Sequence, residues 1–196
     1  MSRRLRVMAL MLLVVASSCA PRERSGPAPR NLDNACAILA ERPSYLRAFR
    51  QTERRWGVPV AVQMAIIYQE SKFVPNARPP HQYALGVIPI GRQSSAMGYS
   101  QALDGTWAEY EAQQGRGRRD DIFDATDFMG WYMNGTLREL GIPLHDVENQ
   151  YLAYHEGRNG YRRQSHQEKA WLLRVAADLK TRAQMYDAQL RSCRRI

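Results

Sequence analysis

Residues 122–140 read IFDATDFMGWYMNGTLREL. Within this stretch Ile122, Thr126, Met129, Met133 and Leu137 follow one another at intervals of three or four residues, and Leu140 continues the series. That interval places side chains on one face of an α-helix. The stretch therefore predicts a long helix with one face against a core.

The same helical period recurs on both sides of this stretch. The predicted helices include one that ends at Gly57, one that runs from Val60 up to Glu70, a short one at Trp107 and Tyr110, one through Tyr151 and Tyr154 that ends at Gly157, and a final one from Trp171 to Leu190. No alternating pattern typical of strands extends beyond a few residues. We therefore expect an all-α domain with about six to eight helices.

Residues 72–97 differ from the rest of the chain because they show no sustained period. Pro75, Pro79, Pro80 and Pro89 interrupt them, together with several Gly, Ser and Gln residues. Long loops inside a compact domain are uncommon unless they are functional or partly disordered. We expect this segment to be a loop that forms a wall or lid of a cleft.

The first residues have the composition of a secretory signal. Arg3, Arg4 and Arg6 precede an apolar run over 7–15, which is too short to span a bilayer, and small residues lead up to Cys19. The small residues before Cys19 are similar to a bacterial lipobox, although Ala16 replaces the usual Leu. We expect lipidation of Cys19, with ordinary signal cleavage as the alternative.

The domain organisation follows from this leader. Residues 1–18 are the expected signal peptide, 19–34 a lipidated tether rich in Pro, Arg, Gly and Ser, and 35–196 the folded domain. The expected location is the periplasm, with a lipid anchor in the outer membrane.

Cysteine usage fits an oxidising compartment. With Cys19 lipidated, Cys36 and Cys193 remain and can form one disulfide, or they can stay free thiols. The chain has no CxxC motif, and its four histidines show no ligand spacing, so we expect no metal site.

The formal net charge is +9. A basic surface attracts nucleic acids and anionic envelope polymers alike. Export argues against nucleic acid, and an anionic envelope polymer is therefore the expected partner.

Three short motifs follow one another along the chain: Gln69-Glu70-Ser71, Gly98-Tyr99-Ser100-Gln101 and Ala153-Tyr154-His155-Glu156-Gly157. In this order they resemble the soluble lytic transglycosylases (SLT) of the lysozyme superfamily, whose usual signature is ES, then GLMQ, then AYNAG. The resemblance covers about residues 44–190. It implies an all-α, lysozyme-like SLT domain.

Glu70 has a physical interpretation of its own. On a helix it lies three and four residues after Ile67 and Ile66, so its carboxyl group projects beside apolar side chains. Loss of hydration disfavours the charged form and raises the pKa, which suits a catalytic acid. The structural alternative is a glutamate that caps the helix or pairs with an arginine.

The resemblance implies roles for the other motif residues. Ser71 and Gln101 would hydrogen-bond the sugar, the turn at Gly98 would bring backbone groups to it, and the hydroxyl of Tyr154 would orient the catalytic carboxyl. Tyr99 and Ser100 replace Leu and Met of the family, and a tyrosine can stack on a sugar ring.

His155 and Glu156 replace Asn and Ala of the family motif. They alter the local hydrogen bonds, and Glu156 adds a second ionisable group that would suit a hydrolytic variant, or else is a surface glutamate.

The resemblance also implies a reaction that needs no cofactor. Glu70 would cleave the β-1,4 bond between N-acetylmuramic acid and N-acetylglucosamine in peptidoglycan glycan strands, leaving 1,6-anhydromuramic ends. The alternatives are a lysozyme-like muramidase, which is a hydrolase, and a catalytically silent glycan-binding lipoprotein.

Overall fold

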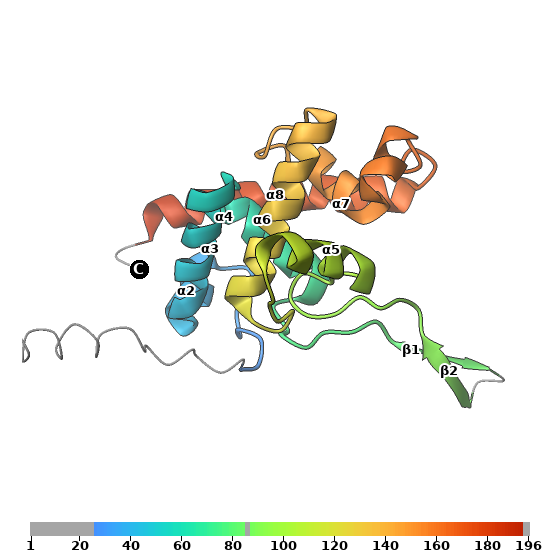
Figure 1. Cartoon of the computed structure of the whole chain (residues 1–196). Coiled ribbons are helices and arrows are strands. Elements are labelled where there is room, and N and C mark those ends of the chain that lie inside the picture. Colours follow the sequence, from blue (N-terminus) through green and yellow to red (C-terminus); the bar gives the residue numbers. More distant parts are fainter. Residues whose placement is uncertain (1–25, 85–86, 194–196) are drawn as a thin grey trace, which may run out of the picture.

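The computed structural model describes residues 26–84 and 87–193, which form seven helices and one two-stranded sheet (Figure 1). The elements are α2 (Ala35–Glu41), α3 (Pro43–Trp56), α4 (Val60–Ser71), β1 (His81–Ala84), β2 (Ile88–Arg92), α5 (Asp104–Gln114), α6 (Ile122–Leu140), α7 (Val147–Arg162) and α8 (Ala170–Ser192). The expected helical fold is confirmed. The expected signal at 1–18 and Cys19 lie outside the described residues, among which no helix has the length and apolar character needed to cross a membrane.

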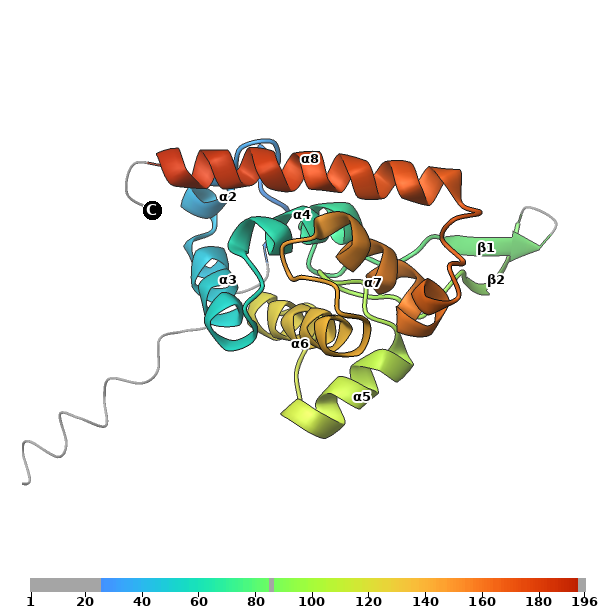
Figure 2. The same cartoon turned by 90° about the horizontal axis from the view of Figure 1, so that it is seen from above.

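Helix α4 lies in the middle of the molecule. Helix α8 runs along one side, with α2, α4 and α7 beneath it (Figure 2). Residues 61–67 of α4 are all buried, because this segment is apolar around most of its circumference. The end of α4 therefore carries Glu70 to a point where several elements meet.

Helices α3 and α6 pack closely against each other at Gly130. A Cβ atom there would lie 2.4 Å from the Trp56 ring, so only glycine allows this approach. The contact also holds a buried carboxylate: Asp127 accepts hydrogen bonds from Trp56, Arg55 and Tyr110 at 2.8 Å each. These bonds fix α3, α5 and α6 to one another.

The two ends of the described domain are joined covalently. Cys36 on α2 and Cys193, directly after α8, form a disulfide with a Cα–Cα distance of 5.7 Å. Gln189 adds two hydrogen bonds between the same segments, accepting from the Ala35 amide at 2.7 Å and donating to the Asp33 carbonyl at 2.9 Å. Of the two possibilities that the sequence left open, the structure contains the disulfide.

The segment 72–97 is not wholly the loop that the sequence predicted. Strands β1 and β2 pair antiparallel within it, with His81 opposite Arg92, and the hairpin projects away from the helices (Figures 1 and 2). Its exposed side chains include Tyr83, Val87 and Ile90. Alternating apolar and polar residues in a sequence indicate a strand with one buried face. A hairpin surrounded by solvent lacks that signal, which is why the strands were missed.

Helix α7 extends past its predicted end. Gly157 leaves the helical conformation, with φ 72° and ψ 153°, but helical turns resume and continue to Arg162. The predicted end at Gly157 is therefore a kink. The sequence indicated the break correctly and missed the turns that follow it.

Candidate active site

Glu70 lies in the last turn of α4 and is half-buried, three and four residues after the fully buried Ile67 and Ile66. Burial raises the pKa of its carboxyl group to about 7, and two neighbours, Tyr151 and Lys72, oppose this shift. The carboxyl group is therefore about half protonated at neutral pH and largely protonated below it. A carboxylic acid in that state can donate a proton.

Tyr151 approaches this carboxyl group from α7. Its side chain is 3% exposed, and its hydrogen bonding to Glu70 lowers the pKa of the glutamate. In turn, burial, the charge of Glu70 and this hydrogen bond raise the pKa of Tyr151 above its ordinary range, while a hydrogen bond with Gln69 lowers it. The phenol thus remains neutral and available as a donor to Glu70.

Tyr154 has a different partner from the one that the family resemblance implied. Its hydroxyl donates to the backbone carbonyl of Ser100 at 2.7 Å. Burial and the charge of Glu70 both raise the pKa of Tyr154, so the ring lies within the electrostatic reach of the carboxyl group. Tyr154 therefore joins the second motif to the third near Glu70, while Tyr151 bonds the carboxyl group itself.

Sequence reasoning placed Tyr151 on a helix and gave it no role at the site. The signal that could have found it is its spacing, because Tyr151 precedes Tyr154 by three residues and so shares its helix face. Two tyrosines on one face were equally good candidates for the carboxyl group, and only the packing of α7 against α4 distinguishes them.

The turn at 98–101 depends on unusual backbone conformations. Gly98 has φ 82°, and a Cβ atom there would lie 2.1 Å from the backbone oxygen of Arg119. Gln101 has φ 48°, and its Nε2 donates to the carbonyls of Ala77 and Gly98 at 2.9 and 2.8 Å. The Gln101 amide group therefore stabilises the turn, and a role for its donor in sugar binding stays a prediction.

Tyr99 does not lie where a sugar ring could stack on it. Its side chain is 2% exposed, packs edge-to-face against Tyr45, and shares a 3.0 Å hydrogen bond with the Tyr45 hydroxyl. The turn at Gly98 directs the Tyr99 side chain into the core, so the ring is not available for the stacking that a tyrosine at this position could provide. The neighbouring Ser100 is also fully buried, and its carbonyl accepts the bond from Tyr154.

Ser71 lies next to Glu70 but is turned into its own helix. Its hydroxyl is buried and donates to the Ile67 carbonyl at 3.2 Å. Such a bond to the carbonyl four residues earlier keeps the hydroxyl against its own helix. A role for Ser71 in sugar binding stays a prediction.

Glu156 belongs to an ion-pair cluster between α7 and the start of α8. It accepts hydrogen bonds from Lys169 at 2.7 Å, from Ser165, and from His155 at 3.0 Å. Burial would raise its pKa, but these three donors together lower it to about 2. Glu156 is therefore ionised at neutral pH. The ring of the neighbouring His155 lies 5.3 Å from that of the half-exposed Trp171.

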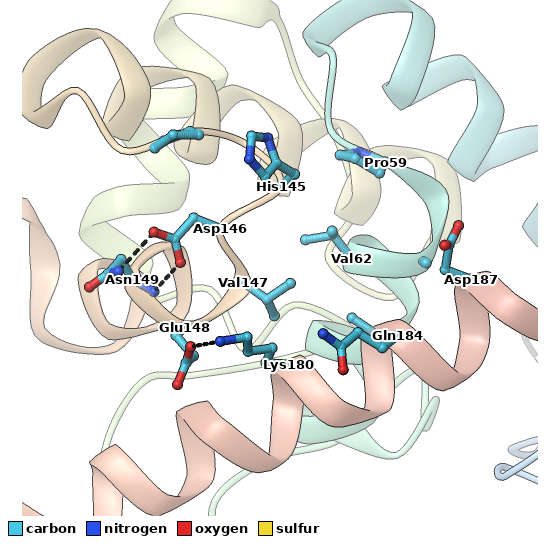
Figure 3. Close-up of a pocket in the computed structure, with 13 residues that line it drawn as sticks. Pro59, Val62, His145, Asp146, Val147, Glu148, Asn149, Lys180, Gln184 and Asp187 are labelled. Atoms are coloured by element: carbon cyan, nitrogen blue, oxygen red, sulfur yellow. Dashed lines mark hydrogen bonds and ion pairs between the residues drawn. The ribbon is translucent and has the colours of Figure 1, made fainter.

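A separate pocket of about 640 Å³ lies at the opposite end of α4 from Glu70 (Figure 3). Pro59, directly before α4, and Val62 on α4 line it. Lys180 enters it from α8 and donates to Glu148 at 2.6 Å. Helix α4 has 12 residues, so about 18 Å separates its two ends. This pocket is therefore not part of the Glu70 site.

Within residues 26–84 and 87–193, no group of three or more His, Cys, Asp or Glu side chains is placed to hold a metal ion. The chemistry available around Glu70 is that of one carboxyl group, two phenols and the charge of Lys72.

Comparison with known proteins identifies the family. The model of a family described as the transglycosylase SLT domain matches residues 7–193. No curated protein and no solved structure matches the chain. The family match spans nearly the whole sequence and includes the three motifs around Glu70. The chain is a member of the transglycosylase SLT domain family, and it has the peptidoglycan-directed, lytic transglycosylase type of function that this family implies.

Proposed function

We propose that this protein cleaves the β-1,4 bond between N-acetylmuramic acid and N-acetylglucosamine and leaves 1,6-anhydromuramic ends, with Glu70 as its single acid and base. The observation that carries the proposal is the state of Glu70. Burial raises its pKa to about 7, so this one group can release a proton and accept one near neutral pH. The alternative, a two-carboxylate glycosidase, needs a second carboxylate at the bond that is cleaved.

The reaction requires one proton to leave Glu70 and one to return. Glu70 gives its proton to the glycosidic oxygen as the bond to the anomeric carbon breaks, and the acetamide oxygen of the muramic sugar bonds to that carbon. The Glu70 carboxylate then takes the proton of the C6 hydroxyl group of the same sugar. The C6 oxygen displaces the acetamide, which closes the 1,6-anhydro ring and restores the protonated acid.

This route consumes no water because the nucleophile belongs to the substrate. An intramolecular nucleophile has a large orientational advantage over a free one. The pKa of Glu70 near neutrality suits both steps, because the same group must release a proton and accept one. The hydrogen bond from Tyr151 favours the carboxylate that exists between the two steps.

Digestion of purified sacculi tests the proposal. The wild-type protein should release anhydromuropeptides, which mass spectrometry distinguishes from hydrolytic products because each is lighter by one water. Glu70→Gln should release no fragments while retaining the wild-type circular dichroism spectrum. Reducing-end products would indicate a muramidase instead, and binding to sacculi without release would indicate a silent glycan-binding protein.

We also propose export to the periplasm with a lipid on Cys19. The support is the sequence of the leader, which lies outside the described residues. Expression of the full chain should yield a membrane-associated protein, and mass spectrometry of its N-terminal peptide should find a diacylated Cys19. Cys19→Ala should release the protein from the membrane fraction, and a wild-type N-terminus without lipid would contradict the proposal.

A further inference from the structure

Two cations stack on one tyrosine ring beside the candidate site. The Lys72 Nζ atom lies 3.6 Å from the ring centroid of Tyr68, and the Arg182 Cζ atom lies 3.4 Å from the same centroid. Two like charges this close to one centroid would collide on the same face, so they lie on opposite faces. The arrangement joins the end of α4 to the middle of α8.

A pocket of about 380 Å³ adjoins this cationic stack. Tyr68, Gln69 and Lys72 line it from the end of α4, and Thr181 and Arg182 are among the residues that line it from α8. Gln69 and Lys72 flank Glu70 in the sequence, and the charge of Lys72 acts on the Glu70 carboxyl group. The pocket is therefore placed to bind a group of the same molecule that reaches Glu70.

The two cations differ in their ion pairs. Arg182 pairs with Asp33 at 2.8 Å, but no ion pair joins Lys72 to any acid in the described part of the chain. Asp178, the acidic residue that lines the pocket, forms no ion pair with either cation among those residues. Burial and the charge of Arg182 lower the pKa of Lys72, and the charge of Glu70 opposes this shift. A bound anion would offset the repulsion between the two cations and pair directly with Lys72.

We propose that this pocket binds a carboxylate on the lactyl side arm of the muramic sugar, with Lys72 as its main contact. The inference rests on the proposed function, which places a muramic sugar at Glu70. Two sources share this chemistry: the lactyl carboxylate itself in peptide-free glycan, and the carboxylates of a stem peptide attached to that arm. Oligomers of N-acetylglucosamine carry neither group.

Binding measurements test the inference without turnover. We would use Glu70→Gln as the parent protein, so that no substitution acts through the charge of the Glu70 carboxylate. Isothermal titration calorimetry would compare three ligands of equal sugar length: an N-acetylglucosamine oligomer, a peptide-free glycan fragment and a peptide-bearing fragment. Lys72→Met in this parent should weaken at least one anionic ligand about ten-fold, which is the order expected for one charge-assisted contact, and leave the neutral oligomer unchanged.

The chain offers matched controls. Lys180→Met removes a lysine from the distant pocket of Figure 3 and should change no affinity. Lys72→Arg keeps the positive charge and should retain most of the binding of the anionic ligands. Thr181→Glu places a negative charge at an exposed position on the opposite wall and should weaken the same ligand as Lys72→Met, even if that variant alters the end of α4.

The outcomes separate this inference from the proposed function. Loss of affinity for the peptide-free fragment assigns the pocket to the lactyl carboxylate, and loss for the peptide-bearing fragment alone assigns it to the stem peptide. Equal effects of Lys72→Met on all three ligands, or on none, would overturn the inference. Release of anhydromuropeptides by the wild-type protein would still support the proposed function in that case.

Discussion

The Tyr151 hydroxyl on α7 and the Glu70 carboxyl group on α4 control each other's ionisation. Hydrogen bonding to Tyr151 lowers the pKa of Glu70 against the larger effect of burial, and the charge of Glu70 raises the pKa of Tyr151. The pKa of Glu70 is thus the result of opposing contributions, of which burial is the largest. The contribution of Tyr151 can be removed by a single substitution.

Tyr151→Phe should move the pH dependence of activity. Loss of the donor raises the pKa of Glu70 further, so the protonated acid persists to higher pH and the alkaline limb of the profile shifts upward by about one pH unit. The rate of turnover should also fall, because the carboxylate loses a fixed contact. Initial rates of sacculus digestion between pH 5 and pH 9 would measure both effects.

Tyr154→Phe is the matched control for that experiment, because its hydroxyl donates to the Ser100 carbonyl at 2.7 Å and not to the carboxyl group. It should lower thermal stability by about 1 kcal/mol, the usual contribution of one hydrogen bond, and shift the alkaline limb less than Tyr151→Phe does. A larger shift for Tyr154→Phe would reverse the assigned roles of the two tyrosines.

Glu70→Gln should stabilise the protein in a pH-dependent manner. The pKa of Glu70 is raised from 4.5 to about 7, so the folded state binds more protons than the unfolded state between these values. Wild-type stability therefore decreases as pH rises from 4.5 to 7, and the cost of ionisation is complete above pH 7. The variant should be more stable by about 2 kcal/mol at pH 8, a figure reduced for the partial exposure of the group, and equal at pH 4. Equal melting temperatures of the two proteins at pH 8 would contradict the raised pKa.

Glu156→Gln should affect stability and leave the products unchanged. The pKa of Glu156 is lowered to about 2, so its contribution is present above pH 4.5 and is lost as pH falls toward 2. The variant should lose about 1 to 2 kcal/mol at pH 7, the order expected for hydrogen bonds to a charged group, reduced because Lys169 is partly exposed. Lys169→Met should lose a similar amount, and the double variant should lose less than the sum, because both remove the 2.7 Å contact. A change from anhydro to reducing-end products would show that Glu156 takes part in the reaction.

Gly98→Ala should disrupt the turn that carries the second motif. The added Cβ would lie 2.1 Å from the Arg119 oxygen, and φ 82° is unfavourable for any side chain. We expect a loss of more than about 2 kcal/mol together with reduced activity. Gly105→Ala is the control, because nothing lies within 4 Å of the added atom and the position lies in the first turn of α5. That variant should be neutral or slightly stabilising by calorimetry, and a similar loss for both would exclude the turn as the cause.

The sequence by itself determined the helical fold, because the apolar residues that form a buried helix face recur at intervals of three or four along the chain. It also placed Glu70 at the edge of a buried face and put the three motifs in the order that identifies the family. The pairing of Cys36 with Cys193 was one of two possibilities it left open, and the structure contains that bond.

Tertiary structure alone decided which side chains meet around Glu70. The choice between Tyr151 and Tyr154, the burial of Tyr99, and the meeting of Lys72 with Arg182 all depend on how α7, α8 and the 98–101 turn pack against α4. The spacing of apolar residues along a helix indicates which face of the helix is buried. It does not indicate which other element packs against that face. Contacts between residues distant in the chain are fixed only when the core closes, and the environment of the candidate acid is made of such contacts.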